Sequence, residues 1–227
     1  MKKKKKIELL MVLLLLIGAI VASKGLSKYV ASGNIEKKEK TVVIDAGHGS
    51  GDPGKIGINQ VLEKDLNLQI AKKVQERLLD QGIHVVMTRE DDIGFYNESE
   101  TNKKIADMKK RVAFINETKP EIAVSIHQNS YPQESVKGAQ VFYYTHSKEG
   151  ERAAKVMQEA LKVLDVNNKR LAKENNTYYL LKKTEVPTII VECGFLSNAE
   201  EAEKLKNDAY QEQVAEAICA GIIKWLD

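Results

Sequence analysis

One pattern recurs along this 227-residue chain: a short apolar run, rich in β-branched residues, leads to a residue that can bind a metal or move a proton. The three runs and the residues that follow them are 41–44 (TVVI) with His48, 121–126 (EIAVSI) with His127, and 187–191 (PTIIV) with Glu192. Runs of this length and composition are typical of buried β-strands. The chain must therefore fold so that reactive side chains lie where strands end.

Segments with the apolar spacing of helices separate these runs. We expect helices at residues 63–81, 103–118, 148–165 and 208–226, and further strands at residues 83–88, 138–145 and 178–181. Strands that alternate with helices favour a three-layer α/β/α fold around a twisted, mainly parallel sheet, here of about six strands. The domain is placed at residues 41–227, which is enough chain for a single large core.

In open parallel sheets, ligands collect beyond the carboxyl ends of the strands. His48, His127 and Glu192 are expected at that edge, and Glu63 joins them because its helix begins directly after the His48 loop. Two histidines and one carboxylate form a catalytic zinc ligand set that leaves the fourth position to water. The remaining glutamate has the chemistry of a general base. These residues therefore predict a metal-dependent hydrolytic site.

Each of these residues also has a plainer explanation when it is taken alone. His48 could be a turn residue, and His127 a core histidine with satisfied hydrogen bonds. Glu63 would be favoured by the helix dipole at a helix N-terminus, and Glu192 could be one half of an ion pair. Four such residues at equivalent positions favour a shared site over four independent coincidences.

The remaining histidines and the cysteines are interpreted as structural. His84 lies inside an alternating strand pattern, and His146 follows a predicted edge strand. Cys193 is adjacent to Glu192, so a catalytic thiol is the alternative to a small buried side chain. Cys219 lies on the apolar face of the last helix. A disulfide is permitted in an exported chain, and the sequence leaves the pairing of the two cysteines open.

The order of six short blocks carries a family resemblance. The blocks are VIDAGHG, LEKD, TRE, SIHQNS, GAQVFYY and VECGFLSN. They resemble those of the zinc-dependent N-acetylmuramoyl-L-alanine amidases of the amidase-3 type, and most closely the short spore-cortex, germination-specific branch (CwlD-type). The resemblance implies that His48, Glu63 and His127 bind one zinc ion. It also implies that Glu192 is the catalytic residue.

Three positions near these blocks depart from the family pattern. Lys55 stands where the family often has alanine, Gln128 where a small or apolar residue is usual, and Cys193 where an aliphatic residue is common. None of them is a predicted zinc ligand. Gln128 and Cys193 flank the site, so the departures bear on substrate preference.

The N-terminus predicts export. Five lysines precede an apolar run within residues 1–23, which is the pattern of a signal peptide or an N-terminal membrane anchor. Residues 24–40 are polar and are interpreted as a linker. Residues 1–40 contain ten lysines and three glutamates, so the rest of this chain, whose formal net charge is +3, is acidic. A nucleic-acid partner is therefore not indicated, and membrane contact is expected only through the N-terminal segment.

The resemblance implies an extracytoplasmic hydrolase of peptidoglycan. It would cut the amide between the lactyl group of N-acetylmuramic acid and the L-alanine of the stem peptide, as a step toward muramic lactam in the spore cortex. Muropeptides are the expected partners. Two alternatives remain open from sequence: a zinc peptidase of similar fold that cuts another wall peptide bond, and a non-catalytic wall-binding protein.

Overall fold

The computed structural model describes residues 11, 15–20, 22, 40–96 and 99–227. The chain divides into two compact units, Met1–Glu39 and Lys40–Asp227, and the fold described below is that of the second unit. Most of the predicted targeting segment (residues 1–23) and all of the linker (residues 24–40) except residue 40 lie outside the described residues, so both remain predictions. Among the helices that the structure describes, none is long and apolar enough to cross a membrane.

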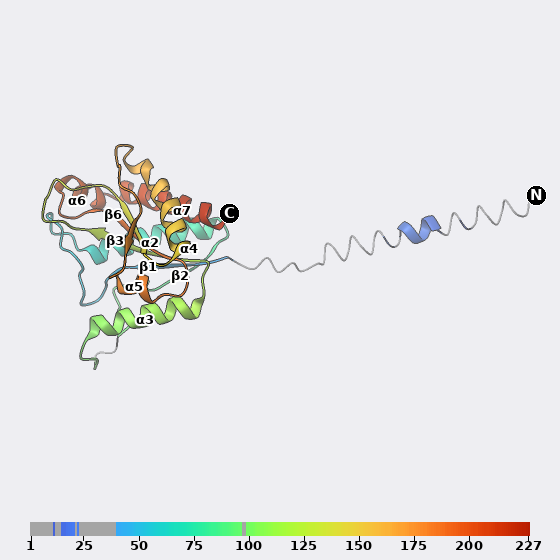
Figure 1. Cartoon of the computed structure of the whole chain (residues 1–227), viewed down its shortest axis with the longest axis horizontal. Coiled ribbons are helices and arrows are strands. Elements are labelled where there is room, and N and C mark those ends of the chain that lie inside the picture. Colours follow the sequence, from blue (N-terminus) through green and yellow to red (C-terminus); the bar gives the residue numbers. More distant parts are fainter. Residues whose placement is uncertain (1–10, 12–14, 21, 23–39, 97–98) are drawn as a thin grey trace, which may run out of the picture. The chain divides into compact units, whose positions relative to one another are not determined.

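A six-stranded sheet forms the centre of the Lys40–Asp227 unit, in the order β2-β1-β3-β6-β4-β5. The strands, in chain order, are β1 (Thr41–Ala46), β2 (His84–Met87), β3 (Ile122–Asn129), β4 (Gln140–Tyr144), β5 (Lys173–Asn175) and β6 (Thr188–Phe195). Neighbouring strands pair in parallel except β4 and β6, which are antiparallel. The predicted α/β fold with a mainly parallel sheet is confirmed (Figure 1).

Helices cover both faces of the sheet and make the three layers (Figure 1). One face packs against α2 (Glu63–Asp80), α4 (Lys148–Ala160), α6 (Ala199–Lys206) and α7 (Asp208–Leu226). The other face packs against α3 (Lys103–Thr118) and α5 (Tyr179–Lys183). Successive strand residues point to opposite faces, so Val42 and Ile44 join the first core while Val43 joins the second. The central residues of β1, 42–44, are all apolar because both faces of the strand are buried there.

One predicted strand is wrong and one predicted helix is shorter. The sequence predicts a strand at residues 178–181, but a helix, α5, occupies most of this segment, and the edge strand β5 lies earlier. The side-chain oxygen of Asn175 accepts the backbone N–H of Tyr178 (2.7 Å), which turns the chain after β5. The helix predicted at residues 148–165 ends at Ala160 and continues as a 3-10 helix at Leu161–Leu164.

The central strands β3 and β6 are longer than the sequence predicts. The apolar runs predict that these strands end at His127 and Glu192, whereas β3 continues to Asn129 and β6 to Phe195. His127 and Glu192 are partners in the parallel register of these two strands. The pairing becomes irregular directly after His127. The polar pair therefore lies on neighbouring strands of the sheet and not in flexible loops.

We expect the sheet core to be sensitive to cavities. Ile189 on β6 is fully buried in the first core, so Ile189→Ala should lower the free energy of unfolding by about 2–5 kcal/mol, through lost burial and the cavity left behind. Val163, which is 73% exposed, provides the matched control. Val163→Ala should change the free energy of unfolding by less than about 0.5 kcal/mol. Chemical denaturation measures both, and equal effects would contradict this description of the core.

Candidate metal and catalytic site

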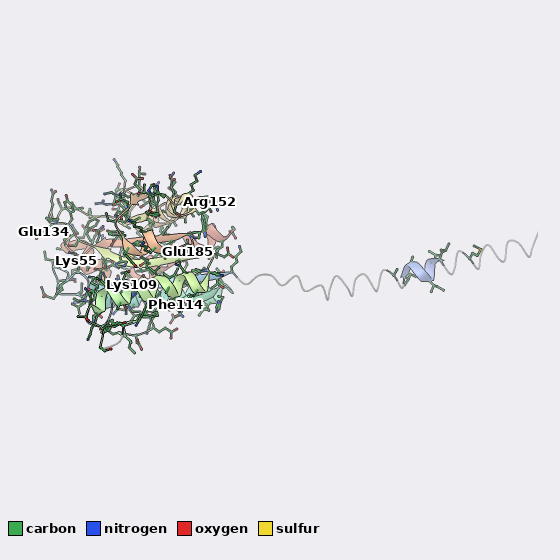
Figure 2. All side chains as sticks on the ribbon, turned by 60° about the horizontal axis from the view of Figure 1, so that its bottom comes forward. Lys55, Lys109, Phe114, Glu134, Arg152 and Glu185 are labelled. Atoms are coloured by element: carbon green, nitrogen blue, oxygen red, sulfur yellow. The ribbon has the colours of Figure 1, made fainter. Side chains whose placement is uncertain are left out.

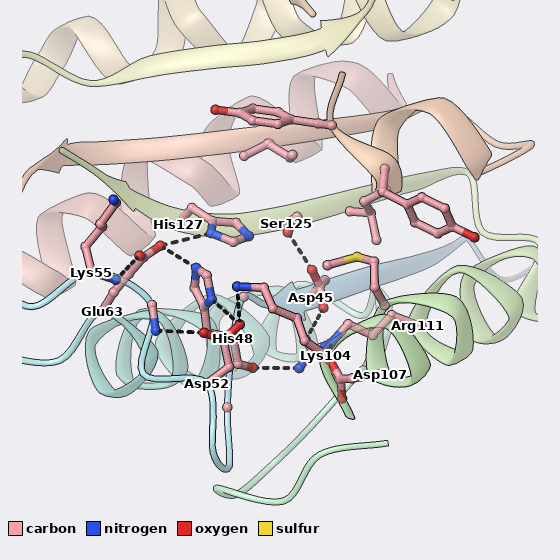
Figure 3. Close-up of a pocket in the computed structure, with 18 of the residues that line it drawn as sticks. Asp45, His48, Asp52, Lys55, Glu63, Lys104, Asp107, Arg111, Ser125 and His127 are labelled. Carbon is pink, nitrogen blue, oxygen red and sulfur yellow. Dashed lines mark hydrogen bonds and ion pairs between the residues drawn. The ribbon is translucent and has the colours of Figure 1, made fainter. Parts of the chain in front are cut away.

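Three predicted zinc ligands converge at the carboxyl edge of the sheet. His48 lies in the loop after β1, Glu63 is the first residue of α2, and His127 lies on β3. The Oε1 atom of Glu63 is 3.1 Å from Nε2 of His48 and 2.9 Å from Nδ1 of His127. The candidate ligand atoms of the three residues all lie within 4.8 Å of one another. The three donors are therefore close enough to share one metal ion (Figure 3).

Glycines make this close approach possible. A Cβ atom at Gly54 would lie 2.6 Å from the Glu63 carboxylate and 2.7 Å from the His48 ring. A Cβ atom at Gly47 would lie 2.3 Å from the His127 ring. Gly54 also has a φ of +69°, which favours glycine. The Gly-rich loop is therefore required for the side chains of the site to meet.

The Glu63 carboxylate is fixed on all sides. It is buried, and its oxygens accept the backbone N–H groups of Lys55 (2.8 Å) and Gln128 (3.1 Å) in addition to the histidine contacts. Burial alone would raise the pKa of Glu63, but hydrogen bonds from His127 and His48 outweigh it and hold this pKa far below its usual range. The Glu63 side chain is therefore held rigidly in its ionised form, as a metal ligand must be.

His48 is oriented by a carboxylate that the sequence analysis did not identify. The Nδ1 atom of His48 lies 3.0 Å from Oδ2 of Asp52, and the same oxygen lies 3.0 Å from the ammonium of Lys104. An ionised carboxylate only accepts hydrogen bonds, so His48 donates through Nδ1 and presents Nε2 toward Glu63. Carboxylates commonly orient metal-binding histidines in this way. The signal in the sequence was an aspartate four residues after His48 in the same Gly-rich loop.

Buried arginines hold the backbone of the His48 loop. Arg111 on α3 donates to Asp45 Oδ1 (2.7 Å) and to the carbonyl oxygen of His48 (2.6 Å). Arg89 donates to the carbonyl oxygens of Ala46 (2.9 Å) and Gly47 (3.2 Å). Three consecutive carbonyl groups are thus held by two guanidinium groups. Neither arginine was among the predicted site residues, although Arg89 belongs to the TRE block.

Asp45 provides the negative charge that this arrangement needs. Its oxygens also accept the hydroxyl groups of Thr88 (2.6 Å) and Ser125. Burial opposes ionisation of Asp45, but the charge of Arg111 and the two hydroxyl groups lower its pKa to about 2. The carboxylate is therefore charged at neutral pH and ties β1 to α3.

Glu192 differs from Glu63 in its surroundings. It lies beside His127 on the neighbouring strand and is 7% exposed. Its Oε2 atom has no hydrogen-bond partner among the described residues. Burial raises the pKa of Glu192 to about 7. A carboxylate with a pKa close to neutrality can both accept and donate a proton under ordinary conditions.

The four predicted site residues line one cavity of about 780 Å³. Its wall also includes Tyr96, parts of α3, the end of β3 and the first residues of α5. The structure does not place His84 or His146 in this wall; His84 contacts Thr41 at the opposite end of β1. Both histidines are thus separate from the site.

Both cysteines are free and buried. Burial raises the pKa of Cys193 far above its usual range, so this thiol is a poor nucleophile at neutral pH. Cys219 packs in the first core, where its thiol lies 3.5 Å from the carbonyl oxygen of Val74. Their surroundings favour the structural interpretation over a catalytic thiol.

Residues 42–224 match the N-acetylmuramoyl-L-alanine amidases of the amidase-3 type. The chain belongs to this family. A germination-specific N-acetylmuramoyl-L-alanine amidase of Bacillus subtilis is 38% identical over 189 residues, which make up 82% of this chain and 79% of that protein. The CwlD amidase from Clostridioides difficile, whose structure is known in complex with the GerS lipoprotein, is 40% identical in sequence. The match covers 82% of this chain and 98% of that chain, and the two superpose with a TM-score of 0.80. The catalytic domain of CwlV from Bacillus (Paenibacillus) polymyxa is 32% identical, covers 83% and 98% of the two chains, and has a TM-score of 0.73.

Family membership confirms the predicted enzyme activity. The protein is an N-acetylmuramoyl-L-alanine amidase and therefore a hydrolase of peptidoglycan. This finding favours the amidase over both alternatives, a peptidase for another wall bond and a non-catalytic binding protein. The four site residues lie within the matched region, 42–224. Their individual roles remain predictions.

The buried Glu192 carboxyl predicts a pH-dependent stability of the metal-free protein. A pKa raised from 4.5 to about 7 contributes stability that is complete below pH 4.5 and is lost as the pH rises through 7. In the presence of a chelator, the free energy of unfolding of Glu192→Gln, measured relative to that of the wild type, should therefore rise by about 2–3 kcal/mol between pH 5 and pH 8. Chemical denaturation measures this difference. A difference that stays constant with pH would contradict the assigned environment of Glu192.

Proposed function

We propose that this amidase holds one zinc ion with His48, Glu63 and His127, and that Glu192 moves the proton during hydrolysis. One observation carries the proposal: three converging side chains share a cavity with a buried carboxylate, one oxygen of which has no hydrogen-bond partner in the described part of the chain. The donor set fits the metal, because two imidazoles and one carboxylate are the ligands of catalytic zinc sites. The glycines that would clash if they carried a Cβ atom support the same fit.

The residues of the site divide the chemistry among them. A bound zinc ion would polarise the lactyl carbonyl group and lower the pKa of water to about 7. Glu192 takes the proton from the attacking water and passes it to the nitrogen of the departing L-alanine, so that the peptide leaves as a neutral amine. Asp52 favours the His48 tautomer with its proton on Nδ1, which would leave the Nε2 lone pair to hold the metal. Arg111 and Arg89 keep the His48 loop in place.

The substrate places the reaction outside the cytoplasm. Peptidoglycan lies beyond the membrane, and the lysine-rich, apolar N-terminus is suited to export, so we place the catalytic unit on the extracytoplasmic side with membrane contact only through residues 1–23. A germination-specific relative and the similarity to CwlD support a role in the spore. We propose that the enzyme acts on the spore cortex, where removal of the stem peptide frees the lactyl carboxyl group for muramic lactam formation.

Product analysis tests this proposal. The zinc-loaded full-length protein, incubated with cortex muropeptides, should release stem peptides that begin with a free L-alanine amine, as identified by mass spectrometry. A chelator should stop the release and added zinc should restore it. The far-UV circular dichroism should change little on chelation, because the ligands lie on elements that the sheet already holds.

Two results would contradict the proposal. Peptides cut at another bond would show a peptidase. Chelation that unfolds the protein would show a structural metal site, which differs from the open catalytic site proposed here.

A further inference from the structure

Lys55 stands beside the proposed metal site on a rigid backbone. Its N–H donates to Oε2 of Glu63 (2.8 Å), and its carbonyl oxygen accepts the N–H of Glu63 (2.9 Å). The preceding residue, Gly54, lies against Glu63 and His48. The main chain of Lys55 is therefore fixed to a metal ligand, while its side chain is exposed and lines the cavity.

The ammonium group of Lys55 is available to a ligand. Other cations of the cavity wall are paired: Lys104 with Asp52 (3.0 Å) and Arg111 with Asp45 (2.7 Å). In the described part of the chain, the Lys55 ammonium makes no hydrogen bond or ion pair. Figure 3 shows it pointing away from the carboxylate of Glu63, whose oxygens already accept other donors.

The chemistry of the substrate indicates what this charge would bind. The lactyl carboxyl group is consumed in the scissile amide and the sugar rings are uncharged, so the free carboxylates of a muropeptide belong to its stem peptide. A peptide advances at most about 3.5 Å per residue, so the residue after L-alanine lies within about 7 Å of the scissile nitrogen. A lysine fixed beside a metal ligand can reach a group at that distance.

The rest of the cavity wall suits the sugar. Tyr178, Tyr179 and Leu180 contribute to it where α5 begins, on the opposite face of the sheet from α2. Aromatic rings offer apolar faces with polar edges, which match the faces and hydroxyl groups of a sugar ring. The cavity thus extends from Lys55, in the loop before α2, to an aromatic region where α5 begins. The scissile amide would lie between them at the proposed metal site.

We propose that Lys55 binds the free carboxylate of the stem residue that follows L-alanine, and thereby makes the enzyme prefer stems with a carboxylate over stems with a carboxamide at this position. The inference rests on the proposed function, because it assumes that the scissile amide lies beside Glu63. Lys55 acts here as a specificity residue that contacts substrate, and it takes no part in the proton transfer.

The inference is tested by comparing two substrates with three forms of the enzyme. The substrates are disaccharide-tripeptides that differ only in whether the residue after L-alanine carries a carboxylate or a carboxamide. The zinc-loaded full-length enzymes are the wild type, Lys55→Ala and Lys55→Arg. Lys109→Ala, on the exposed side of α3 (Figure 2), is the matched control. Rates are measured as kcat and KM at low and at high salt.

We expect the wild type to prefer the carboxylate by roughly two- to fivefold in kcat/KM, the range of a partly exposed ion pair. The preference should appear in KM, should weaken in high salt, and should survive in Lys55→Arg and Lys109→Ala. It should disappear in Lys55→Ala, with kcat little changed.

Two results would overturn the inference, and they are distinguishable. If the ratio of kcat/KM between the two substrates is the same in the wild type and in Lys55→Ala, and both substrates are cut at the lactyl amide, then Lys55 binds no carboxylate and the proposed function still stands. Failure of the wild type to cut either substrate at that bond would overturn the proposed function and this inference together.

Discussion

The ion pair between Asp45 and Arg111 is the interaction on which the site depends. Both side chains are buried, and their contact joins the end of β1 to α3. Losing one partner of such a pair typically costs about 3–5 kcal/mol, because the other charge stays buried and unpaired. The same guanidinium binds the carbonyl oxygen of His48. A contact that stabilises the fold therefore also sets the backbone position of a proposed metal ligand.

The two glutamates of the site show how surroundings give one residue type two different properties. Glu63 meets two histidines and two backbone N–H groups, so its charge is stabilised and its pKa is lowered. Glu192 is buried, and within the described residues one of its oxygens has no hydrogen-bond partner, so its pKa rises to about 7. Pairs of carboxyl groups with separated pKa values are a common basis for dividing roles in an active site. Here the division separates a candidate ligand from a candidate base.

The sequence predicted the fold and the gathering of His48, Glu63, His127 and Glu192, because parallel strands deliver the residues at their carboxyl ends to one edge. It could not predict that β3 and β6 continue past the site, since that depends on pairing between strands far apart in the chain. The apolar and aromatic residues at 178–181 (YYLL) suggested a strand, but tertiary contacts place a helix there. Asp52 and Arg89 were missed because their contacts appear only once the loops are folded.

One measurement tests the central claim most directly: the zinc content and turnover of Glu63→Ala and Glu192→Gln after dialysis against metal-free buffer. Loss of a ligand should lower zinc affinity and turnover together, whereas loss of a general base should leave the metal bound and reduce the rate by roughly 10²–10⁴. We predict that Glu63→Ala loses its zinc and that Glu192→Gln retains about one zinc per chain while it hydrolyses muropeptide at that reduced rate. Loss of zinc from Glu192→Gln, or turnover near the wild-type rate, would contradict the roles assigned to the two residues.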